Sequence, residues 1–434
     1  MAKSYDAIII GAGVIGAATA FEMTKAGMKT LSVDMAPAAG YGSTSNSCAI
    51  IRVHYSTFDG TAFAWEGYHY WKDWAAYLGV EDERGLCRFV ECGCVVMKTE
   101  HNDHLARHAS LCEQLSIPHE HWNEAQIVEK LPIYEMSSYW PPRRMEDDKF
   151  ATSNGKRISG AVWFPTAGYI NDPQLSAHNL QVAAEAKGAE FLFQRRVVEV
   201  TRGDGRVSGV RLDDGTEISA PVVVNVAGPH SGKVNEMAGV TGDMNMTTKA
   251  LRQEVVHVPS PDGFDFEHQG TVVSDSDISC YSRPETGNHI LFGSEDPDCD
   301  GHQFVDPDDF NRDFTDQWRT QALRAGQRVP TLGIPNRMRG AVDLYDVTED
   351  WIPIYDKSNL PGYYMACGSS GNQFKNAPVA GAMMAALVQY CEDGNDHDTD
   401  PLQFNMSYTG LDMDVGFYSR KREINQDSSF SVLG

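Results

Sequence analysis

The chain has 434 residues, of which 41% are hydrophobic and 22% charged, as in globular proteins with two or three structural units. Its net charge of −24 disfavours nucleic acid and acidic lipid as partners, because phosphates would be repelled. No apolar run is long enough for a membrane span. The nine scattered cysteines favour reduced thiols and a cytoplasmic location. We expect no metal, because Cys92 and Cys94 lack a second pair at zinc spacing and are expected to alternate on a strand.

The first residues show the pattern of a strand, a turn, a helix and a second strand. Residues 7–10 form an apolar run typical of a buried parallel strand, and residues 17–25 are small and helix-favouring. Residues 29–33 predict a strand that ends on Asp34. A secretory signal also places a basic residue, here Lys3, before an apolar run, but Glu22 and Lys25 inside the segment disfavour export.

Three glycines follow the first strand at the spacing of a dinucleotide-binding turn. Gly11 permits the turn, Gly13 lets the backbone approach a pyrophosphate, and Gly16 lets the helix pack on the strand. The unpaired N–H groups at the helix start favour phosphate, and Asp34 can accept a hydrogen bond from a ribose hydroxyl. The sequence therefore predicts that the chain binds a dinucleotide.

The rest of the chain alternates between strand and helix patterns. Helical patterns span residues 62–77, 103–115, 173–187, 307–325 and 378–390. Strand patterns span residues 89–98, 161–164, 194–201, 207–212, 216–219, 221–228 and 362–367, and residues 245–345 are otherwise strand-like. Residues 134–157 are polar and rich in Pro and Met, which indicates a long surface excursion: a solvated loop, a lid or a partner surface.

The candidate nucleotide-binding strands lie near residues 7, 223 and 364, so this sheet is assembled from distant segments. Such interleaving favours an extended FAD over a nicotinamide cofactor, whose domain is usually contiguous. We predict an α/β fold, with a Rossmann-like FAD-binding domain of the glutathione-reductase type interleaved with an α+β substrate domain built on an antiparallel sheet. The expected FAD-binding domain comprises residues 1–85, 155–232 and 338–396, the substrate domain 86–154 and 233–337, and a C-terminal tail 397–434.

Short motifs in a fixed order carry a resemblance to a known family. Besides the glycine turn, they are residues 42–45 (GSTS) with 50–52 (IIR), 163–169 (WFPTAGY) with 172–173 (DP), 224–228 (VNVAG), 281–284 (YSRP), 339–342 (RGAV) and 368–375 (GSSGNQFK). With these motifs the chain resembles the D-amino acid oxidase superfamily of flavoproteins, and most of all the branch with sarcosine oxidases and dimethylglycine dehydrogenase. Residues 134–157 and the polar segment after about 400 lie outside the match.

The resemblance implies a set of residues that bind FAD. Ser43 and Thr44 would meet the pyrophosphate, Ile50 the isoalloxazine, and Val197 the adenine end through its backbone. The turn at residues 371–375 would offer N–H groups to the flavin pyrimidine, where a helix N-terminus also stabilises the anionic reduced flavin. The full set is Gly11, Gly13, Val14, Ile15, Gly16, Asp34, Met35, Ser43, Thr44, Ser45, Ala49, Ile50, Val197, Ala227, Gly228, Gly371, Asn372, Gln373, Phe374 and Lys375.

Arg52 and Lys375 stand at the two positions where sarcosine oxidases hold the substrate carboxylate over the flavin. An Arg fork suits a carboxylate, and Lys adds a point charge. A structural ion pair or a solvated side chain is the alternative, but two cations at matched positions in so acidic a chain favour substrate binding. Tyr281 stands where the family has an active-site tyrosine, with core packing as the alternative. His54 and His257 are expected to be structural, because amine oxidation by flavin needs no strong protein base.

Several residues depart from the family pattern. Leu291 replaces the lysine that activates oxygen in sarcosine oxidase, and Glu295 replaces an active-site histidine, so these departures favour a protein or quinone acceptor over O₂. Asp343 and Asn46 stand where family members carry a flavin-linked cysteine and histidine, so we predict non-covalent FAD. Ala49 replaces a basic residue beside the flavin, which leaves that side roomier and less positive.

The resemblance implies an enzyme that oxidises the C–N bond of an amino acid or N-methylated amino acid. A hydride would pass to flavin N5, and the resulting imine would hydrolyse. Two alternatives stay open: a 2-hydroxy acid dehydrogenase of the same superfamily, and the flavin subunit of a hetero-oligomeric oxidase. The expected partners are a small carboxylated amine, O₂ or an electron-transfer acceptor, and possible partner subunits.

Overall fold

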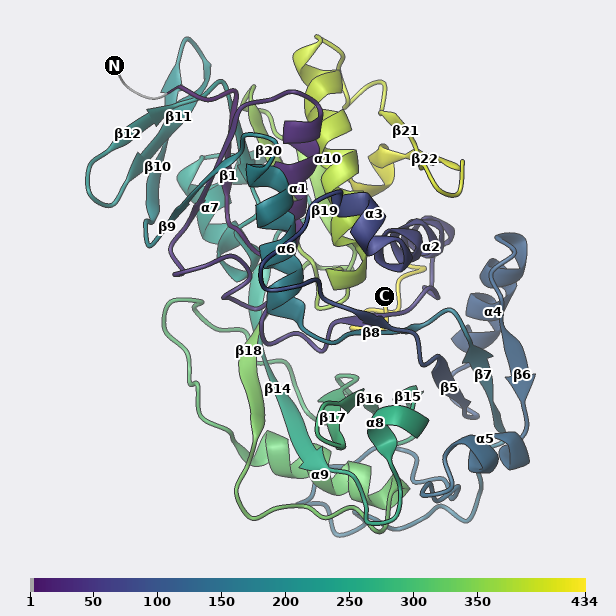
Figure 1. The fold of residues 1–434 in the computed structure, drawn as a ribbon. Helices are drawn as coiled ribbons and strands as arrows, with labels where there is room; N and C mark the ends of the chain where they lie inside the picture. Colours follow the sequence, from purple (N-terminus) through teal and green to yellow (C-terminus); the bar gives the residue numbers. More distant parts are fainter. Residues whose placement is uncertain (1–3) are drawn as a thin grey trace.

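The computed structural model describes residues 4–434, which build two large sheets (Figure 1). The first has six strands in the order β19-β20-β13-β1-β2-β9, all parallel to their neighbours except β19. They are β1 (Ala7–Ile10), β2 (Thr30–Asp34), β9 (Glu190–Phe193), β13 (Val222–Asn225), β19 (Ile354–Lys357) and β20 (Tyr363–Cys367). The predicted strands near residues 7, 223 and 364 therefore lie side by side as β1, β13 and β20.

Alternate residues of β1 face two different layers. Ala7 and Ile9 belong to a core with the helices α1 (Val14–Lys25), α6 (Pro173–Glu185) and α10 (Ala377–Glu392). Ile8 and Ile10 face the predicted meander, which is confirmed as β10 (Val197–Gly203), β11 (Arg206–Leu212) and β12 (Glu217–Ser219), together with α7 (Ser231–Met237). The six-stranded sheet is therefore covered on both sides.

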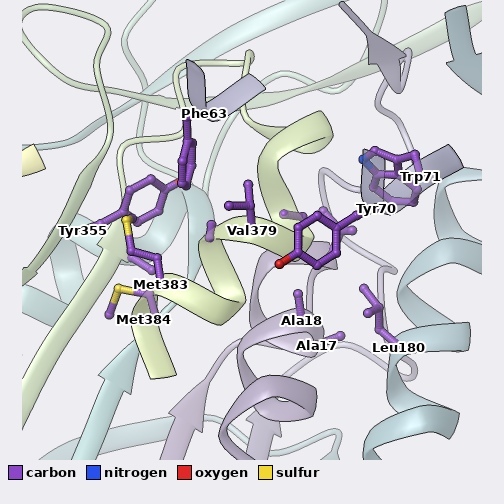
Figure 2. Close-up of a cluster of buried hydrophobic side chains, with 14 of the residues drawn as sticks. Ala17, Ala18, Phe63, Tyr70, Trp71, Leu180, Tyr355, Val379, Met383 and Met384 are labelled. Atoms are coloured by element: carbon purple, nitrogen blue, oxygen red, sulfur yellow. The ribbon is translucent and has the colours of Figure 1, made fainter. Parts of the chain in front are cut away.

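Small residues let α1 and α10 approach each other closely. A Cβ added to Gly381 of α10 would lie only 2.6 Å from the carbonyl carbon of Ala18 in α1. Around this contact, Val379, Met383 and Met384 of α10 pack with Phe63 and Tyr70 of α2 (Phe58–Lys72) (Figure 2). This packing fixes α1, and with it the glycine turn that precedes the helix.

The second large sheet has eight strands in the order β18-β14-β17-β16-β15-β5-β7-β6. They are β5 (Cys94–Lys98), β6 (Glu120–Trp122), β7 (Gly160–Phe164), β14 (Lys249–Pro259), β15 (Val272–Asp275), β16 (Cys280–Glu285), β17 (His289–Ser294) and β18 (Gly340–Val347). Helix α9 (Asp316–Arg328) packs on one face through Trp318, Ala322 and Ala325. β7 and β18 fall within ranges expected for the FAD-binding domain, but β7 pairs with β5, and β18 pairs with β14 along its whole length.

A small sheet, β3-β8-β4, lies near the junction of the two large ones. It joins β3 (Ile50–Ile51), β8 (Gly168–Ile170) and β4 (Phe89–Val90), so the predicted strand 89–98 is split into β4 and β5, with Cys92 in the break and Cys94 in β5. The other elements are α3 (Trp74–Leu78), α4 (His104–Gln114), α5 (Glu124–Lys130), α8 (Phe266–Gln269), η1 (Gly228–His230), η2 (Thr241–Asp243) and η3 (Phe374–Asn376). Within residues 4–434, no helix combines the length and apolarity that crossing a bilayer requires.

The helix predicted over residues 307–325 begins only at Asp316, so its predicted start is wrong. The Thr315 hydroxyl caps the helix by accepting from the Gln317 N–H at 3.2 Å. The preceding residues are held by Arg252, whose guanidinium donates to the carbonyl oxygens of Asn311 at 2.7 Å and Asp313 at 2.6 Å. A distant arginine therefore binds carbonyl groups that a longer helix would have paired internally.

The excursion at residues 134–157 has no helix or strand, but it is anchored rather than merely solvated. Tyr134 and Met136 are buried, and Arg328 of α9 donates to the Ser137 carbonyl oxygen at 2.8 Å. Ser138 Oγ lies 2.6 Å from a carboxylate oxygen of the buried Asp277. Among the described residues that line the cavity discussed below, none comes from this excursion.

Ser138→Ala is expected to lower the free energy of unfolding by about 2 kcal/mol, because it removes a buried hydrogen bond to a carboxylate. The measurement is the urea midpoint of the purified protein. Ser159→Ala, at an exposed serine whose hydroxyl makes only a 3.5 Å contact with the Lys98 carbonyl, is the matched control. Equal midpoints for the two variants would show that Ser138 does not anchor the excursion.

The C-terminal tail packs onto the rest of the chain. It contains β21 (Gln403–Asn405), β22 (Asp412–Asp414) and η4 (Val415–Tyr418). Arg420 is fully buried and pairs with Asp356 at 3.0 Å and Asp398 at 2.8 Å, and Arg422 pairs with Asp350 at 2.7 Å. Beyond these ion pairs the chain continues into the region between the two large sheets, where Gly434 lies (Figure 1).

Candidate active site

A cavity lies between the carboxyl ends of β1, β13 and β20 and the eight-stranded sheet. This is the edge of a parallel sheet at which α/β proteins bind ligands. The first wall comprises residues 13–16, Ser43, Thr44, residues 46–50, Arg52, Val226, Gly228, Pro229, Ala366, Ser369 and residues 371–375. The second comprises Cys94, Gln253, Val255, residues 272–274, Tyr281, Ala341, residues 343–346, Val432 and Leu433.

The glycine turn has the close contacts that its sequence predicts. A Cβ on Gly11, whose φ is +109°, would lie 2.3 Å from the Val226 carbonyl oxygen, and one on Gly16 would lie 2.2 Å from the Gly11 carbonyl oxygen. A Cβ on Gly13 would have only Thr44 Oγ1 nearby, at 3.2 Å. Gly11 and Gly16 therefore serve packing, whereas Gly13 presents its backbone to the cavity.

Asp34 organises this turn from the end of β2. Its carboxylate accepts from the Ala12 N–H at 2.7 Å and from the Ala36 N–H at 2.7 Å. Asp34 is not among the described residues that line the cavity, and the same holds for five other residues of the predicted cofactor set, namely Gly11, Met35, Ser45, Val197 and Ala227. Val197 is buried in the core beneath the six-stranded sheet, and Met35 is 46% exposed.

The turn at residues 371–375 is fixed by Asp346, which the sequence analysis did not single out. The Asp346 carboxylate accepts from the Gly368 N–H at 2.7 Å and from the Ser369 hydroxyl, and its carbonyl accepts from the Ser370 N–H at 2.8 Å. Gly371 has a φ of +69°, and a Cβ there would lie 2.5 Å from the Tyr345 ring. The turn then leads into η3 and α10, so a helix start faces the cavity as predicted.

Arg52 and Lys375 come together in the cavity, as the family resemblance implies. They are 7% and 3% exposed, and both lie against Tyr55, with Arg52 Cζ 4.4 Å and Lys375 Nζ 5.0 Å from the ring centre. Lys375 Nζ donates to the Tyr55 hydroxyl at 2.9 Å and to the Asn372 carbonyl oxygen at 2.6 Å. Burial and the neighbouring Arg52 hold the pKa of Lys375 well below its usual value.

Neither cation has an acidic partner. Among residues 4–434, no carboxylate lies within ion-pair distance of Arg52 or Lys375. Arg52 instead donates through NH1 to the His54 carbonyl oxygen and through NH2 to the Val432 carbonyl oxygen at 3.0 Å. Because an unpaired buried charge is costly, the site is suited to an anion, which would compensate Arg52 and favour the protonated form of Lys375.

Tyr281 lies in the opposite wall. Its hydroxyl is 3.4 Å from the Tyr345 hydroxyl and 3.7 Å from Cys48 Sγ, and burial holds the pKa of Tyr281 well above its usual value. Sequence reasoning found Tyr281 but missed Tyr345 and Cys48. In the sequence, Tyr345 is marked only by lying close to residues 339–342, and Cys48 only by lying close to Ile50. Their contacts with Tyr281 join positions far apart in the chain, which a sequence pattern does not show.

Two carboxyl groups lie behind this wall. Glu295 is buried, and one of its oxygens accepts from Ser274 Oγ at 2.6 Å, while the other has no hydrogen-bond partner among the described residues. Burial raises the pKa of Glu295 to about 7, against the opposing effects of Ser274 and Arg52. Burial likewise raises the pKa of Asp296 to about 7. Glu295 is therefore largely neutral on the acid side of pH 7.

Glu295→Gln should change how stability depends on pH. The pKa of Glu295 is raised in the folded state, so the folded protein still holds a proton that the unfolded chain releases at about pH 4.5. The contribution of Glu295 to the free energy of unfolding therefore falls as the pH rises from about 4.5 to 7. The free energy of unfolding of Glu295→Gln, taken relative to that of the parent protein, should therefore be on the order of 2 kcal/mol higher at pH 8 than at pH 5. Denaturation at both pH values measures this gain, with the exposed Glu217→Gln as the control. A difference from the parent that is the same at both pH values would contradict the raised pKa.

The residues present suit FAD. Helix α1 begins at the cavity with no acidic residue in its first turn, which favours a pyrophosphate there, and Thr44 Oγ1 accepts from the Val14 N–H at 3.1 Å. The lining then runs from this helix start to the turn at residues 371–375, so it offers a path for an elongated dinucleotide. Gly13 to Gly16, Ser43 and Thr44 would hold the pyrophosphate, and residues 371–375 would face the flavin ring.

Sequence comparison with known proteins also points to FAD-dependent enzymes. The sequence profile of the FAD dependent oxidoreductase family matches residues 6–387. Sarcosine oxidase subunit beta of Rhodobacter capsulatus is 26% identical over 397 residues, covering 89% of this chain and 85% of the relative. Glycine oxidase of Geobacillus kaustophilus is 25% identical over 405 residues, covering 91% of this chain and 96% of the relative.

Solved structures share the fold. L-proline dehydrogenase from P. horikoshii superposes with a TM-score of 0.75 at 19% identity, covering 97% of this chain and 98% of the other. Glycine oxidase from Geobacillus kaustophilus gives a TM-score of 0.72 at 20% identity, covering 97% and 100%. The profile match extends over most of the chain and includes both the glycine turn and the turn at residues 371–375. The chain therefore belongs to the family of FAD-dependent oxidoreductases.

Proposed function

We propose that this chain oxidises the C–N bond of a small amino acid or N-methylated amino acid, and that Arg52 and Lys375 bind the substrate carboxylate. The observation that carries the proposal is that Arg52 and Lys375 lie buried in the cavity with no carboxylate of residues 4–434 at ion-pair distance. A carboxylate bound between them would compensate the charge of Arg52 and favour the protonated form of Lys375. The names of the relatives support the choice, because glycine and sarcosine are both small carboxylated amines.

When bound, FAD supplies the acceptor for the hydride that leaves the substrate carbon. The protein's own residues bind and orient the substrate. Lys375 Nζ already donates to Tyr55 and Asn372, so a further proton taken up at Nζ would be the one available to the substrate. A carboxylate beside Lys375 would raise its lowered pKa, so substrate binding would be accompanied by proton uptake at Nζ. Tyr281 and Tyr345 would form the wall that excludes water.

Other properties of the enzyme belong to the same proposal. FAD would be held non-covalently, since Asn46 and Asp343 bond to each other and neither is a cysteine or histidine. The acceptor would be O₂ or an electron-transfer partner. Association with partner subunits is supported by the relative named as a subunit. A cytoplasmic location would suit the nine free cysteines. The division into a discontinuous FAD-binding domain, a substrate domain and a tail is proposed with β7 and β18 contributed to the substrate sheet.

A 2-hydroxy acid would present the same carboxylate to Arg52 and Lys375, so the substrate class must be tested directly. Purified protein is mixed anaerobically with sarcosine, glycine, L-proline or 2-hydroxy acids, and bleaching of the flavin absorbance band is followed. Bleaching by the amines alone supports the proposal, and bleaching by hydroxy acids alone overturns it. Admitting air then reports whether O₂ reoxidises the flavin. Bleaching of the isolated chain also shows that partner subunits are not needed for substrate oxidation.

A further inference from the structure

Residues 430–434 reach the cavity beside Arg52, although their sequence predicts a polar tail outside the family match. Val432 and Leu433 line the same cavity as Arg52, Tyr281 and Lys375. Val432 is 8% exposed and packs with Leu251, Val347 and Trp351, against the rings of Tyr281 and Tyr345. In Figure 1 this yellow segment reaches the space between the two large sheets.

The segment contacts the cavity through main-chain groups. The Val432 carbonyl oxygen accepts from Arg52 NH2 at 3.0 Å, and the Gly434 carbonyl oxygen accepts from the Ser56 N–H at 3.1 Å. Gly434 lies against Tyr55, since a Cβ added there would be 2.2 Å from the ring. Within the segment, the Gly434 N–H donates to the Ser431 carbonyl oxygen at 3.1 Å, so residues 431–434 form a tight turn over Arg52 and Tyr55.

The base of the segment is held more firmly than its tip. Ser428 Oγ donates to the Asp350 carbonyl oxygen, and the Asp350 carboxylate holds Arg422 with bonds of 2.7 and 2.9 Å. Beyond Ser428, the described contacts of the tip with the rest of the chain are the two main-chain hydrogen bonds, the packing of Val432 and the contact of Gly434 with Tyr55. Residues 430–434 can therefore move without disturbing the buried ion pairs.

We propose that residues 430–434 are a movable wall of the substrate pocket, which limits the size of the substrate and competes with its carboxylate for Arg52. This inference rests on the proposed role of Arg52. A carboxylate is a stronger acceptor than a peptide carbonyl, so it displaces Val432 from Arg52 NH2 when it binds. Val432 and Leu433 meanwhile occupy space that a larger side chain would need. The wall therefore favours small substrates, because a large substrate must displace Val432 from the side chains against which it packs.

The test is to remove the wall and measure carboxylate binding without turnover. A variant that lacks residues 430–434 is compared with the FAD-loaded parent, using acetate as a small probe and indole-3-acetate as a large one. Binding is followed by the shift in the flavin visible spectrum. We expect the deletion to tighten acetate binding about 5-fold and indole-3-acetate binding at least 50-fold. Ile424→Ala, at an exposed residue of the tail that lies outside both the wall and the cavity lining, is the matched control and should stay within 2-fold of the parent.

Arg52→Ala separates the two proposals. If acetate binding depends on Arg52 but the deletion leaves both probes unchanged or weakens them equally, the wall is refuted and the role of Arg52 stands. If acetate binding is the same in the parent and in Arg52→Ala, the proposed carboxylate site itself fails.

A second measurement uses the intact chain, in case the deletion does not fold. Hydrogen exchange is compared with and without saturating acetate. The Ser56 amide, which bonds to Gly434, should exchange at least 5-fold faster when acetate is bound. The Gly434 amide should also lose protection. Unchanged or slower exchange at Ser56 would overturn the proposal, because the hydrogen bond between Ser56 and Gly434 would then persist when a carboxylate binds.

Discussion

Arg52→Ala is expected to raise the half-saturating concentration of a carboxylated amine about 100-fold, which corresponds to about 2.7 kcal/mol of lost binding energy. The reason is that Arg52 is buried beside Lys375 and offers the only guanidinium in the cavity lining of residues 4–434. The measurement is anaerobic flavin reduction as a function of substrate concentration. FAD content, read from the ratio of visible to ultraviolet absorbance, should stay close to that of the parent.

Two controls show whether the effect comes from the guanidinium. Arg52→Met keeps most of the side-chain volume against Tyr55 and should lose binding as Arg52→Ala does, whereas Arg196→Ala, at an exposed residue that pairs with Asp308, should bind normally. Adding free guanidinium to Arg52→Ala should restore part of the affinity. If Arg52→Ala instead loses its FAD and keeps its apparent affinity, the carboxylate role is wrong.

Gly13→Val is expected to abolish FAD binding while leaving the fold intact. Gly13 faces the cavity, where a Cβ meets only Thr44 Oγ1 at 3.2 Å, so a branched side chain would stand where the pyrophosphate must approach. We expect colourless protein with an unchanged circular dichroism spectrum, and no recovery of the visible band when FAD is added.

Gly11→Ala gives the contrast. Its Cβ would lie 2.3 Å from the Val226 carbonyl oxygen at a φ of +109°, so this change should destabilise the protein itself, by roughly 3 kcal/mol or more. The urea midpoint separates the two outcomes. If Gly13→Val retains FAD, the pyrophosphate does not lie at this turn.

The local part of the fold could be read from the sequence. The apolar runs that became β1, β13 and β20 are fully buried parallel strands, which alternate little and end in glycine or polar turns. The spacing of Gly11, Gly13 and Gly16 is a local steric requirement, so sequence alone identifies it. Helix ends were less predictable. Helix α9 starts later than its sequence predicts, because Arg252 of β14 binds a carbonyl group of the segment that precedes the helix.

The residues of the candidate site also fall into those that short motifs mark and those that only the structure reveals. Arg52 and Lys375 were identified by their positions in short motifs, and the structure places them together. What the sequence could not show is how those cations are engaged: Arg52 bonds to Val432, which is 380 positions away, and Lys375 bonds to the Tyr55 hydroxyl, 320 positions away. Residues such as Tyr345, Cys48 and Asp346 carry no local pattern that marks them, so only the packing of the two sheets reveals them.

By itself, the sequence determined the dinucleotide-binding unit, because that unit depends on spacing within a short segment. Buried strand patterns at three distant places indicated the interleaved sheet, and the family resemblance pointed to Arg52 and Lys375. Only the tertiary structure decided that the tail enters the cavity and that, within residues 4–434, no carboxylate pairs with Arg52 or Lys375. The physical reason is that burial and hydrogen bonding between distant segments follow from how sheets and helices pack. No window of neighbouring residues contains that information.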